Sequence, residues 1–335
     1  MAVRLAVLFV LFFLMIVAAG AGLALNLAPA DPAAKEPIIV EVAPGSSTSA
    51  IASTLKDFGL IRSVTVFRLA VSAKRADGRL RAGEYQLSKD MPLSDILAKM
   101  LRGQVVTYPF TVPEGYTVIQ VVDLLVRKGF ADPAKLTQIV KEAPMVFPYT
   151  IRSKLVKQPL EGFLFPDTYQ YHKGMSEEAI VTMMLRRFES NFGPDLQARA
   201  AELKMSVPEA VTLASIIERE ARVPAERPII SAVYHNRLKI GMKLDADPTV
   251  RYALDHPGDI VTFKDLEVNS PYNTYKNAGL PPGPIAAPGL ASIRAALYPA
   301  DVPYLYFVAK NDGTGAHEFS RTLAEHVRAV RKYQK

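Results

Sequence analysis

One glutamate of this 335-residue chain lies where it could act as an acid catalyst. Ser206 and Glu209 form the Ser-x-x-Glu pattern of a capping box, which predicts a helix that begins there and runs through Ala221. Glu218 lies near the end of this helix. A protonated carboxyl can serve as a general acid, and its conjugate base can then take up a proton. Glu218 is therefore our candidate for acid–base chemistry.

The predicted helix places Glu218 on an apolar face. Four apolar side chains point in nearly the same direction as Glu218: Val207, Val211, Ala214 and Ala221. Glu209 and Glu220 lie on the opposite side. Burial among apolar side chains favours the uncharged form of a carboxyl, as an acid catalyst at neutral pH requires. The alternative from helix geometry is an ion pair between Glu218 and Arg222, one turn further on.

The sequence offers no support for other classes of chemistry. Five histidines show neither the HExxH pattern nor another ligand spacing: His172, His235, His256, His317 and His326. No G-x-S-x-G motif and no phosphate-binding glycine loop occurs. Because the chain has no cysteine, disulfides, thiolate metal sites and a cysteine nucleophile are excluded. We therefore predict no metal and no cofactor.

Four segments in the second half combine glycine, proline and polar residues densely: Leu160–Tyr171, Ser215–Leu254, Ser270–Gly289 and Ala316–His326. The third is too rich in proline and glycine for a helix or strand, and its length suggests a functional loop. A long helical stretch, Glu177–Leu203, separates the first two. The strand-like Pro303–Lys310 is followed by Asn311-Asp312-Gly313, which predicts a hairpin turn.

The first half contains an internal repeat. The chain from Ile38 matches the chain from Tyr108 without gaps, so that Gly45 corresponds to Gly115. Each copy reads as a strand, a turn and a helix with a hydroxyl cap at its start and a glycine at its end. Because any two strand–turn–helix units share part of this pattern, chance similarity is the alternative.

The first copy continues with a helix over Val64–Ala73, a strand over Leu80–Leu87 and a helix over Pro92–Leu101. A βααβ unit of this kind resembles LysM, a module that binds polymers containing N-acetylglucosamine. A spacer or a docking surface is the alternative. We place a LysM-like module at residues 38–104, and residues 105–140 are a candidate second LysM-like unit.

The segment Leu5–Leu25 is an uncharged, almost wholly apolar run. It is long enough to cross the membrane as one helix, which takes roughly 20 residues. Arg4 precedes the run and the charges after it nearly cancel, so the positive-inside rule places the following chain outside the cytoplasm. A cleaved signal peptide is the alternative, but its apolar part usually spans only about 7–15 residues. We predict a cytoplasmic tip and transmembrane anchor at 1–27 and a linker at 28–37.

The net charge of +7 favours anionic partners, such as phospholipid head groups or an acidic cell-wall polymer. No basic block interleaved with aromatic residues occurs, so we predict no nucleic-acid partner. A basic balance is also common on an ordinary solvated surface.

Several rare strings occur together and in order: LEGFLFPDTY, LASIIERE, YHNRL, DADPTV, YNTY and GLPPGPIAAPG. They resemble the signature stretches of the endolytic murein transglycosylases, the MltG or YceG-like family, over roughly residues 38–335. The resemblance implies that Glu218, in the ASIIE stretch, is the catalytic glutamate. The familiar asparagine of the IANPG string is Ala287 here, which puts in doubt a substrate contact from that position.

The resemblance also implies a mechanism that needs one acid. A protonated glutamate gives its proton to the oxygen between N-acetylmuramic acid and N-acetylglucosamine, then takes a proton from the C6 hydroxyl as a 1,6-anhydro ring closes. Residues that the resemblance assigns to positioning the glycan are Glu161, Asp167, Asn236, Asp245, Asp247, Asn273, Thr274 and Tyr275. Without the resemblance, Asp167 and Asp247, each beside a proline, read as turn or capping residues.

We therefore expect an α+β protein with an N-terminal transmembrane helix, small LysM-like βααβ modules and a mixed α+β catalytic domain at 105–335. The expected substrate is peptidoglycan, cleaved inside its strands at the inner membrane and outside the cytoplasm so that strand elongation ends. Peptidoglycan synthases, the penicillin-binding proteins, are candidate partners. Two alternatives remain: a hydrolase that uses Glu218 with Asp247 or Glu161, and a non-catalytic wall-binding scaffold.

Overall fold

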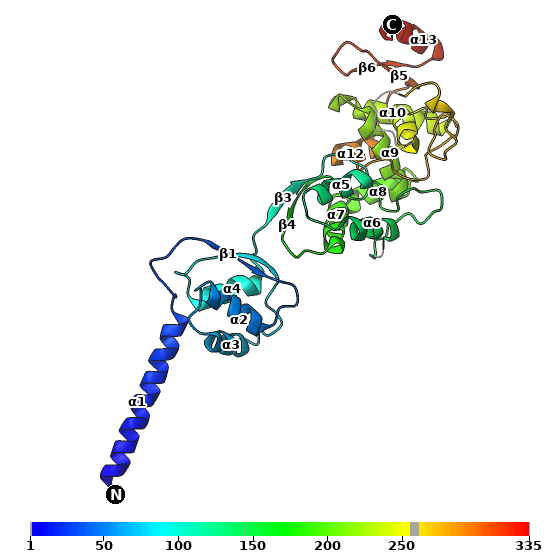
Figure 1. The fold of residues 1–335 in the computed structure, drawn as a ribbon. Helices are drawn as coiled ribbons and strands as arrows, with labels where there is room; N and C mark the ends of the chain where they lie inside the picture. The colour runs from blue at the N-terminus through cyan, green and yellow to red at the C-terminus, as the bar shows by residue number, and fades with distance from the viewer. Residues whose placement is uncertain (1, 144, 255–260, 335) are drawn as a thin grey trace. The chain divides into compact units, whose positions relative to one another are not determined.

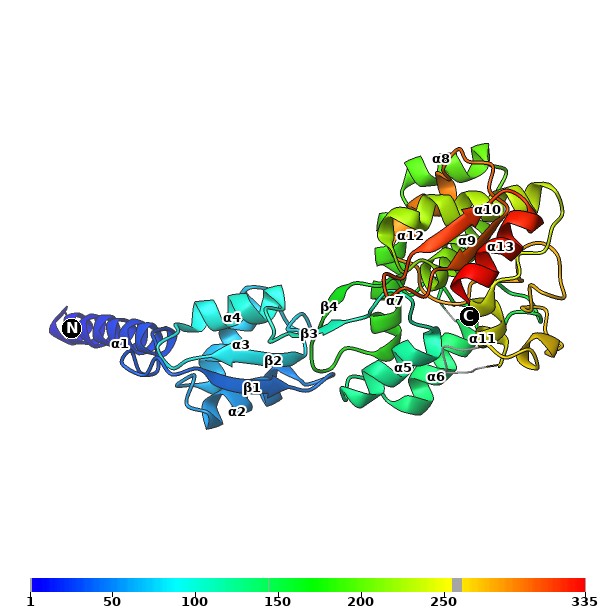
Figure 2. The same ribbon diagram turned by 90° about the horizontal axis from the view of Figure 1, so that it is seen from above.

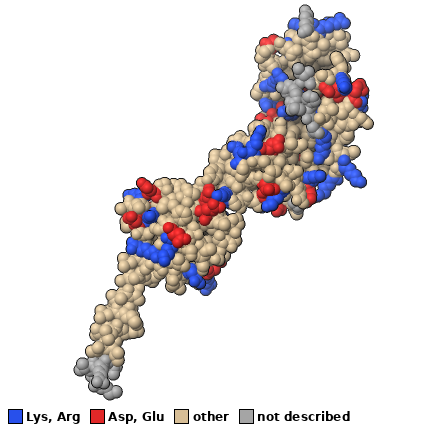
Figure 3. All heavy atoms as spheres, viewed as in Figure 1, with Lys and Arg blue, Asp and Glu red and all other residues tan. Residues whose placement is uncertain are grey.

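The computed structural model describes residues 2–143, 145–254 and 261–334, without the side chains of residues 2–6. The chain begins with helix α1 (Ala2–Leu27), whose segment Val7–Leu27 is long and apolar enough to cross a membrane. Its side chains are exposed along most of its length and carry no charge over this segment (Figure 3). The structure thus contains the helix expected for the anchor at Leu5–Leu25.

The chain divides into two compact units, the first of which includes α1 (Figure 1). Unit 1 contains residues 1–109 together with 170–175, and unit 2 contains residues 110–169 together with 176–335. Both units mix helices with two-stranded sheets, as expected for the α+β class.

Unit 1 contains the expected βααβ order. Its elements are β1 (Ile38–Val42), α2 (Thr48–Asp57), α3 (Val64–Ala73), β2 (Gly83–Leu87) and α4 (Leu93–Arg102). The two strands lie side by side and antiparallel, with Val40 opposite Tyr85 (Figure 2). Alternate residues of each strand face the core, where they meet apolar side chains of the three helices. The resemblance to LysM itself is not established by this element order and stays a prediction.

The internal repeat is present in the structure. The second copy forms β3 (Tyr108–Thr111), α5 (Val118–Arg127) and α6 (Pro133–Glu142), and the later strand β4 (Thr168–Tyr171) pairs with β3. In both copies a hydroxyl side chain, Ser47 or Thr117, caps the first helix. The turn before each cap contains a glycine, Gly45 or Gly115, with a φ of 76°, a conformation that few other residues adopt.

The remaining helices belong to unit 2: α7 (Glu177–Asn191), α8 (Pro194–Glu202), α9 (Val207–Glu220), α10 (Arg227–Lys239), α11 (Asp247–Leu254), α12 (Leu290–Leu297) and α13 (Leu323–Tyr333). The long helical stretch predicted for Glu177–Leu203 is present as two helices, because the chain breaks at Gly193 and starts α8 at Pro194. Proline suits the first turn of a helix but disrupts its interior. The segment expected to be a loop, Ser270–Gly289, contains neither helix nor strand.

Strands β5 (Tyr306–Ala309) and β6 (His317–Ser320) form an antiparallel pair near the end of the chain, with α13 beside them (Figures 1 and 2). Asn311 and Gly313 have positive φ angles in the connection, which is the turn that the sequence predicts. The core of unit 2 surrounds α9, which packs against α12, α10, α11 and α8.

Candidate active site

Helix α9 positions the candidate acid. The Ser206 hydroxyl accepts a hydrogen bond from the Glu209 backbone, and the Glu209 carboxylate accepts one from the Ser206 backbone, which confirms the predicted capping box. The predicted apolar stripe is wrong, however, because every residue from Ala210 to Ile217 is buried. Neighbouring helices enclose the middle of α9 on all sides. The surroundings of Glu218 are therefore set by tertiary contacts and not by one face of the helix.

Glu218 lies near the carboxyl end of α9 with its side chain 7% exposed. Its Oε2 accepts a hydrogen bond of 3.0 Å from the backbone N–H of Gly289, and its Oε1 lies 3.4 Å from Nη2 of Arg227. Arg227 is itself fixed, because its Nε donates to the Ser292 hydroxyl at 3.1 Å. Glu218 thus pairs with Arg227, whereas Arg222, the partner suggested by helix geometry, lies beside Gly315. A backbone donor and a cation both stabilise the carboxylate form.

A second carboxyl, Glu114, lies beside Glu218. Burial and the charge of Glu218 raise the pKa of Glu114, while Arg227 opposes the shift. The turn that carries Glu114 is fastened to the loop before α12: Gly115 N donates to Ala287 O at 2.8 Å, and Ala287 N donates to Tyr116 O at 2.7 Å. Sequence reasoning missed Glu114. The repeat contained a signal, since the position that holds Pro44 in the first copy holds a carboxylate in the second.

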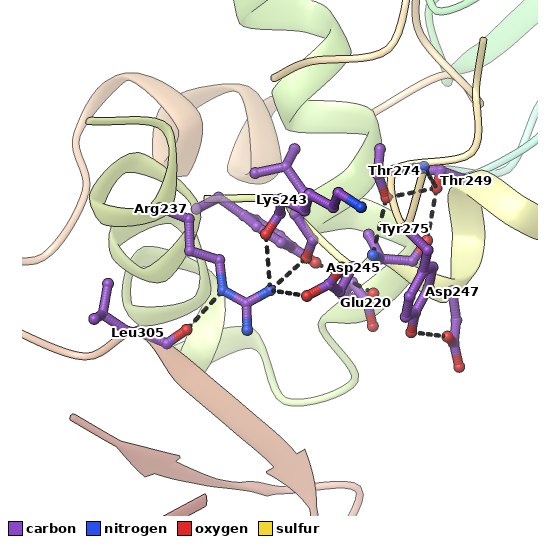
Figure 4. Close-up of polar contacts among 12 residues, drawn as sticks. Glu220, Arg237, Lys243, Asp245, Asp247, Thr249, Thr274, Tyr275 and Leu305 are labelled. Atoms are coloured by element: carbon purple, nitrogen blue, oxygen red, sulfur yellow. Dashed lines mark hydrogen bonds and ion pairs between the residues drawn. The ribbon is translucent and has the colours of Figure 1, made fainter. Parts of the chain in front are cut away.

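The opposite side of α9 carries another group of polar side chains (Figure 4). Residues two apart on a helix point about 200° apart, so Glu220 faces away from Glu218. Glu220 accepts a hydrogen bond from the Tyr234 hydroxyl at 3.2 Å. Burial raises the pKa of Glu220 to about 7, and the charge of Asp247 adds to the shift. Asp247 in turn accepts a hydrogen bond of 2.6 Å from the Tyr275 hydroxyl.

Asp245 lies in the same group, 3.4 Å from the Arg237 guanidinium (Figure 4). Burial raises the pKa of Asp245, and Arg237 opposes this. The Arg237 guanidinium also donates to the backbone oxygens of Lys243, Leu244 and Leu305. Three of the residues predicted to position the glycan, Asp245, Asp247 and Tyr275, are therefore brought together, but around Glu220 and Arg237.

Three other residues predicted to contact the glycan form hydrogen bonds within the protein. The Asn236 amide donates to Val302 O and Tyr304 O, each at 2.9 Å. The Asn273 amide, fully buried, donates to Leu266 O and Val268 O. The Thr274 hydroxyl accepts from Ala246 N and hydrogen-bonds Thr249 at 2.9 Å. These side chains shape the long loop and the start of α11.

The last two predicted contacts lie in the LEGFLFPDTY segment. Glu161 is 1% exposed and accepts hydrogen bonds from Val118 N at 3.0 Å and the Tyr252 hydroxyl at 3.1 Å. Asp167 forms an ion pair with Arg187. For all eight residues, contact with a glycan stays a prediction.

Among the described residues, histidines and carboxylates do not gather into a metal-binding group. Within residues 2–143, 145–254 and 261–334, no three side chains of His, Asp or Glu are close enough together to hold a metal ion. His256, considered in the sequence, lies outside the described residues. A cavity of about 310 Å³ lies at the other end of α9 from Glu218, where its lining includes Glu209, Thr212 and Tyr149. Glu218 does not line this cavity.

Comparison with known proteins identifies the class. The profile of the YceG-like family matches residues 40–332, so the chain belongs to the YceG-like family. An endolytic murein transglycosylase of Bacillus subtilis is 39% identical over 319 residues, which cover 92% of this chain and 88% of that protein. These matches confirm the family resemblance of the sequence motifs.

Two further relatives agree. An endolytic murein transglycosylase of Streptococcus pneumoniae D39 is 29% identical over 335 residues, which cover 90% of this chain and 60% of that protein. The crystal structure of a YceG-like protein from Listeria monocytogenes shares 40% identity and a TM-score of 0.62, covering 88% of this chain and 99% of that chain.

Proposed function

We propose that this protein is an endolytic lytic transglycosylase, with Glu218 as the residue that gives and takes the proton. It cleaves the bond between N-acetylmuramic acid and N-acetylglucosamine inside peptidoglycan strands and leaves 1,6-anhydro ends. The names of the relatives from B. subtilis and S. pneumoniae support the substrate and the reaction class. The observation that carries the assignment of Glu218 is its place at the end of the central helix, nearly buried, against Arg227 and the Gly289 N–H.

The geometry suits a reaction with one acid. Protonated Glu218 donates to the glycosidic oxygen as the bond to the muramic-acid C1 breaks. Arg227 and the Gly289 N–H then stabilise the carboxylate that remains. This carboxylate takes the proton from the C6 hydroxyl of the same sugar, whose oxygen bonds to C1, and the acid is restored. No water molecule is consumed in the reaction.

The anchor supports a place at the membrane. Helix α1 has the length and composition of a single membrane span. We propose that the two units lie outside the cytoplasm, where peptidoglycan is built, and that cleavage near the membrane ends the growth of new strands. If unit 1 binds glycan as LysM modules do, it provides a second contact with the same polymer.

The test compares two glutamates of one helix. Glu218→Gln keeps the shape of the side chain but cannot exchange the proton, so release of 1,6-anhydro products should fall at least about 10²-fold. Glu220→Gln, on the opposite face, is the matched control and should stay within about tenfold of the wild type. Products are identified by mass analysis of digested intact peptidoglycan, and thermal melting checks that both variants fold.

Two outcomes would contradict the proposal. Anhydro products released by Glu218→Gln at a tenth of the wild-type rate or better would remove Glu218 as the acid. Products that end in reducing sugars would instead support the two-carboxylate hydrolase. The partners that sequence reasoning offered for such a hydrolase, Asp247 and Glu161, contact Tyr275 and Tyr252 respectively.

A further inference from the structure

Two carboxyl groups converge on one glycine. Gly289, the residue before α12, donates its backbone N–H to Glu218. The space beside its Cα is taken by the other carboxyl: a Cβ on Gly289 would lie 2.9 Å from Glu114 Oε2 and closer still to Oε1. Glu114 therefore packs directly against the residue that holds Glu218.

The position of Glu114 is fixed by its backbone. Besides the two hydrogen bonds to Ala287, the turn is held by Arg219, whose Nη1 lies 3.4 Å from Gly115 O. A Cβ on Gly115 would lie 3.9 Å from Cγ of Glu218, so this turn lies over the candidate acid. Glu114 itself is exposed, whereas the side chain of Glu218 is 7% exposed. Glu114 is thus the more solvent-accessible of the two carboxyls.

The charges explain why a second carboxyl is useful here. Arg227 and the Gly289 N–H both favour the charged form of Glu218, but a general acid must start the reaction with its proton. A neighbouring carboxylate acts in the opposite direction, because two like charges in one small site disfavour each other. With two carboxyls and one guanidinium, the group is neutral when it holds one proton.

We propose that Glu114 is a positioning residue for the proton on Glu218: its carboxylate, packed against Gly289, offsets Arg227 and keeps Glu218 protonated until the glycosidic oxygen takes the proton. This inference rests on the proposed function, since it assumes that Glu218 is the acid. The charge of Glu218 is one cause of the raised pKa of Glu114, after burial, so the two carboxyls are close enough to interact. The charged groups that face the pair are Arg227 and, across the turn, Arg219.

The experiment measures the pH dependence of kcat/KM for the full chain, as release of anhydro products from purified peptidoglycan strands. Glu114→Gln removes the charge, so the alkaline limb of the profile should move to lower pH by about one unit, which lowers the rate on that limb about tenfold. Glu114→Asp keeps the negative charge, so the alkaline limb of its profile should lie close to that of the wild type. The products should remain anhydro sugars in both variants.

Several results would overturn the inference. A Glu114→Gln profile that coincides with the wild type after scaling would show that Glu114 serves only the fold. A wild type that released products ending in reducing sugars, and a Glu114→Gln variant that did not, would instead make Glu114 a base for water. Should Glu114→Gln fail to fold, Gly289→Ala provides the second perturbation, because its methyl group displaces the Glu114 carboxyl and both glutamates remain. An unshifted alkaline limb in Gly289→Ala would then refute the role.

The outcome for Glu218→Gln separates the two proposals. Activity that survives in Glu218→Gln overturns the proposed function and this inference with it. Activity lost in Glu218→Gln, together with a wild-type profile in Glu114→Gln, overturns the role of Glu114 alone.

Discussion

Glu161 provides a test of how burial controls a carboxyl in this fold. The side chain is almost fully buried and accepts hydrogen bonds from the Val118 backbone and the Tyr252 hydroxyl. Burial raises the pKa of Glu161 to about 7, although both hydrogen bonds act in the opposite direction. Replacement by Gln removes the titration and leaves an oxygen that can still accept from Val118 N.

The sign of the effect follows from which state binds the proton. Between about pH 4.5 and about pH 7, the folded protein holds a proton on Glu161 that the unfolded chain has released. The wild type therefore loses stability as the pH rises through this window. A pKa difference of about 2.5 corresponds to roughly 3 kcal/mol, which is fully expressed above about pH 7. Relative to the wild type, Glu161→Gln should gain about this much free energy of unfolding between about pH 4 and pH 8.

The assay is urea unfolding of the chain without residues 1–27, for wild type and variant at several pH values. The Gln side chain changes the packing by the same free energy at every pH. This change therefore does not affect how the stability difference between variant and wild type varies with pH. The titration of Glu220 cancels too, since it is common to both proteins. Glu189→Gln, at an exposed position of α7, is the control and should show no such pH-dependent gain. A difference between Glu161→Gln and the wild type that stays constant with pH would refute the reasoning.

Two more predictions concern packing and anchoring. Gly162→Ala should destabilise the protein by about 2–4 kcal/mol, because Gly162 has a φ of 83° and an added Cβ would lie 2.5 Å from Pro284 Cβ. Gly279 has a φ of 84° but no atom within 4 Å of an added Cβ, so Gly279→Ala measures the cost of the backbone conformation alone and should lower the melting temperature less. Equal decreases in melting temperature for the two variants would contradict a role for the contact with Pro284. Deletion of residues 1–27 should release the protein from membranes into the soluble fraction, and a reporter fused after Lys335 should work only outside the cytoplasm. A mature N-terminus within residues 20–31 of the full protein would contradict the anchor.

Local features of the fold could be predicted from the sequence because they depend on neighbouring residues. The capping box of α9, the repeated strand–turn–helix pattern and the turn after β5 each follow from residues within one short segment. The break at Gly193 was missed, although Gly193-Pro194 is itself a local signal. The apolar stripe of α9 failed for another reason: a helix enclosed by others on all sides has no single buried face.

The surroundings of the site depend on residues far apart in the chain. Glu218 meets Gly289, 71 residues further on, and the turn of Glu114 lies more than 100 residues before it. No periodicity within α9 could indicate these partners. The group around Glu220 was missed for the same reason, since Asp247 and Tyr275 reach it from α11 and the long loop. Family resemblance pointed to Glu218, but its contacts with Gly289 and Arg227 come from the three-dimensional fold.

The path of the chain through units 1 and 2 limits how the protein can be cut or recombined. The chain passes from unit 1 to unit 2 after residue 109, returns for residues 170–175 and leaves again. Lys173, on the returning segment, pairs with Glu41 at 2.7 Å and Glu84 at 3.4 Å within unit 1. A graft that joined a foreign catalytic domain at residue 104 would leave those two acids without their lysine. A single proteolytic cut between residues 109 and 110 would leave residues 1–109 held only by non-covalent contacts, such as those of Lys173 with Glu41 and Glu84. Neither unit can therefore be replaced by a single continuous segment of another protein. A shortened version that contains unit 1 should keep residues 170–175.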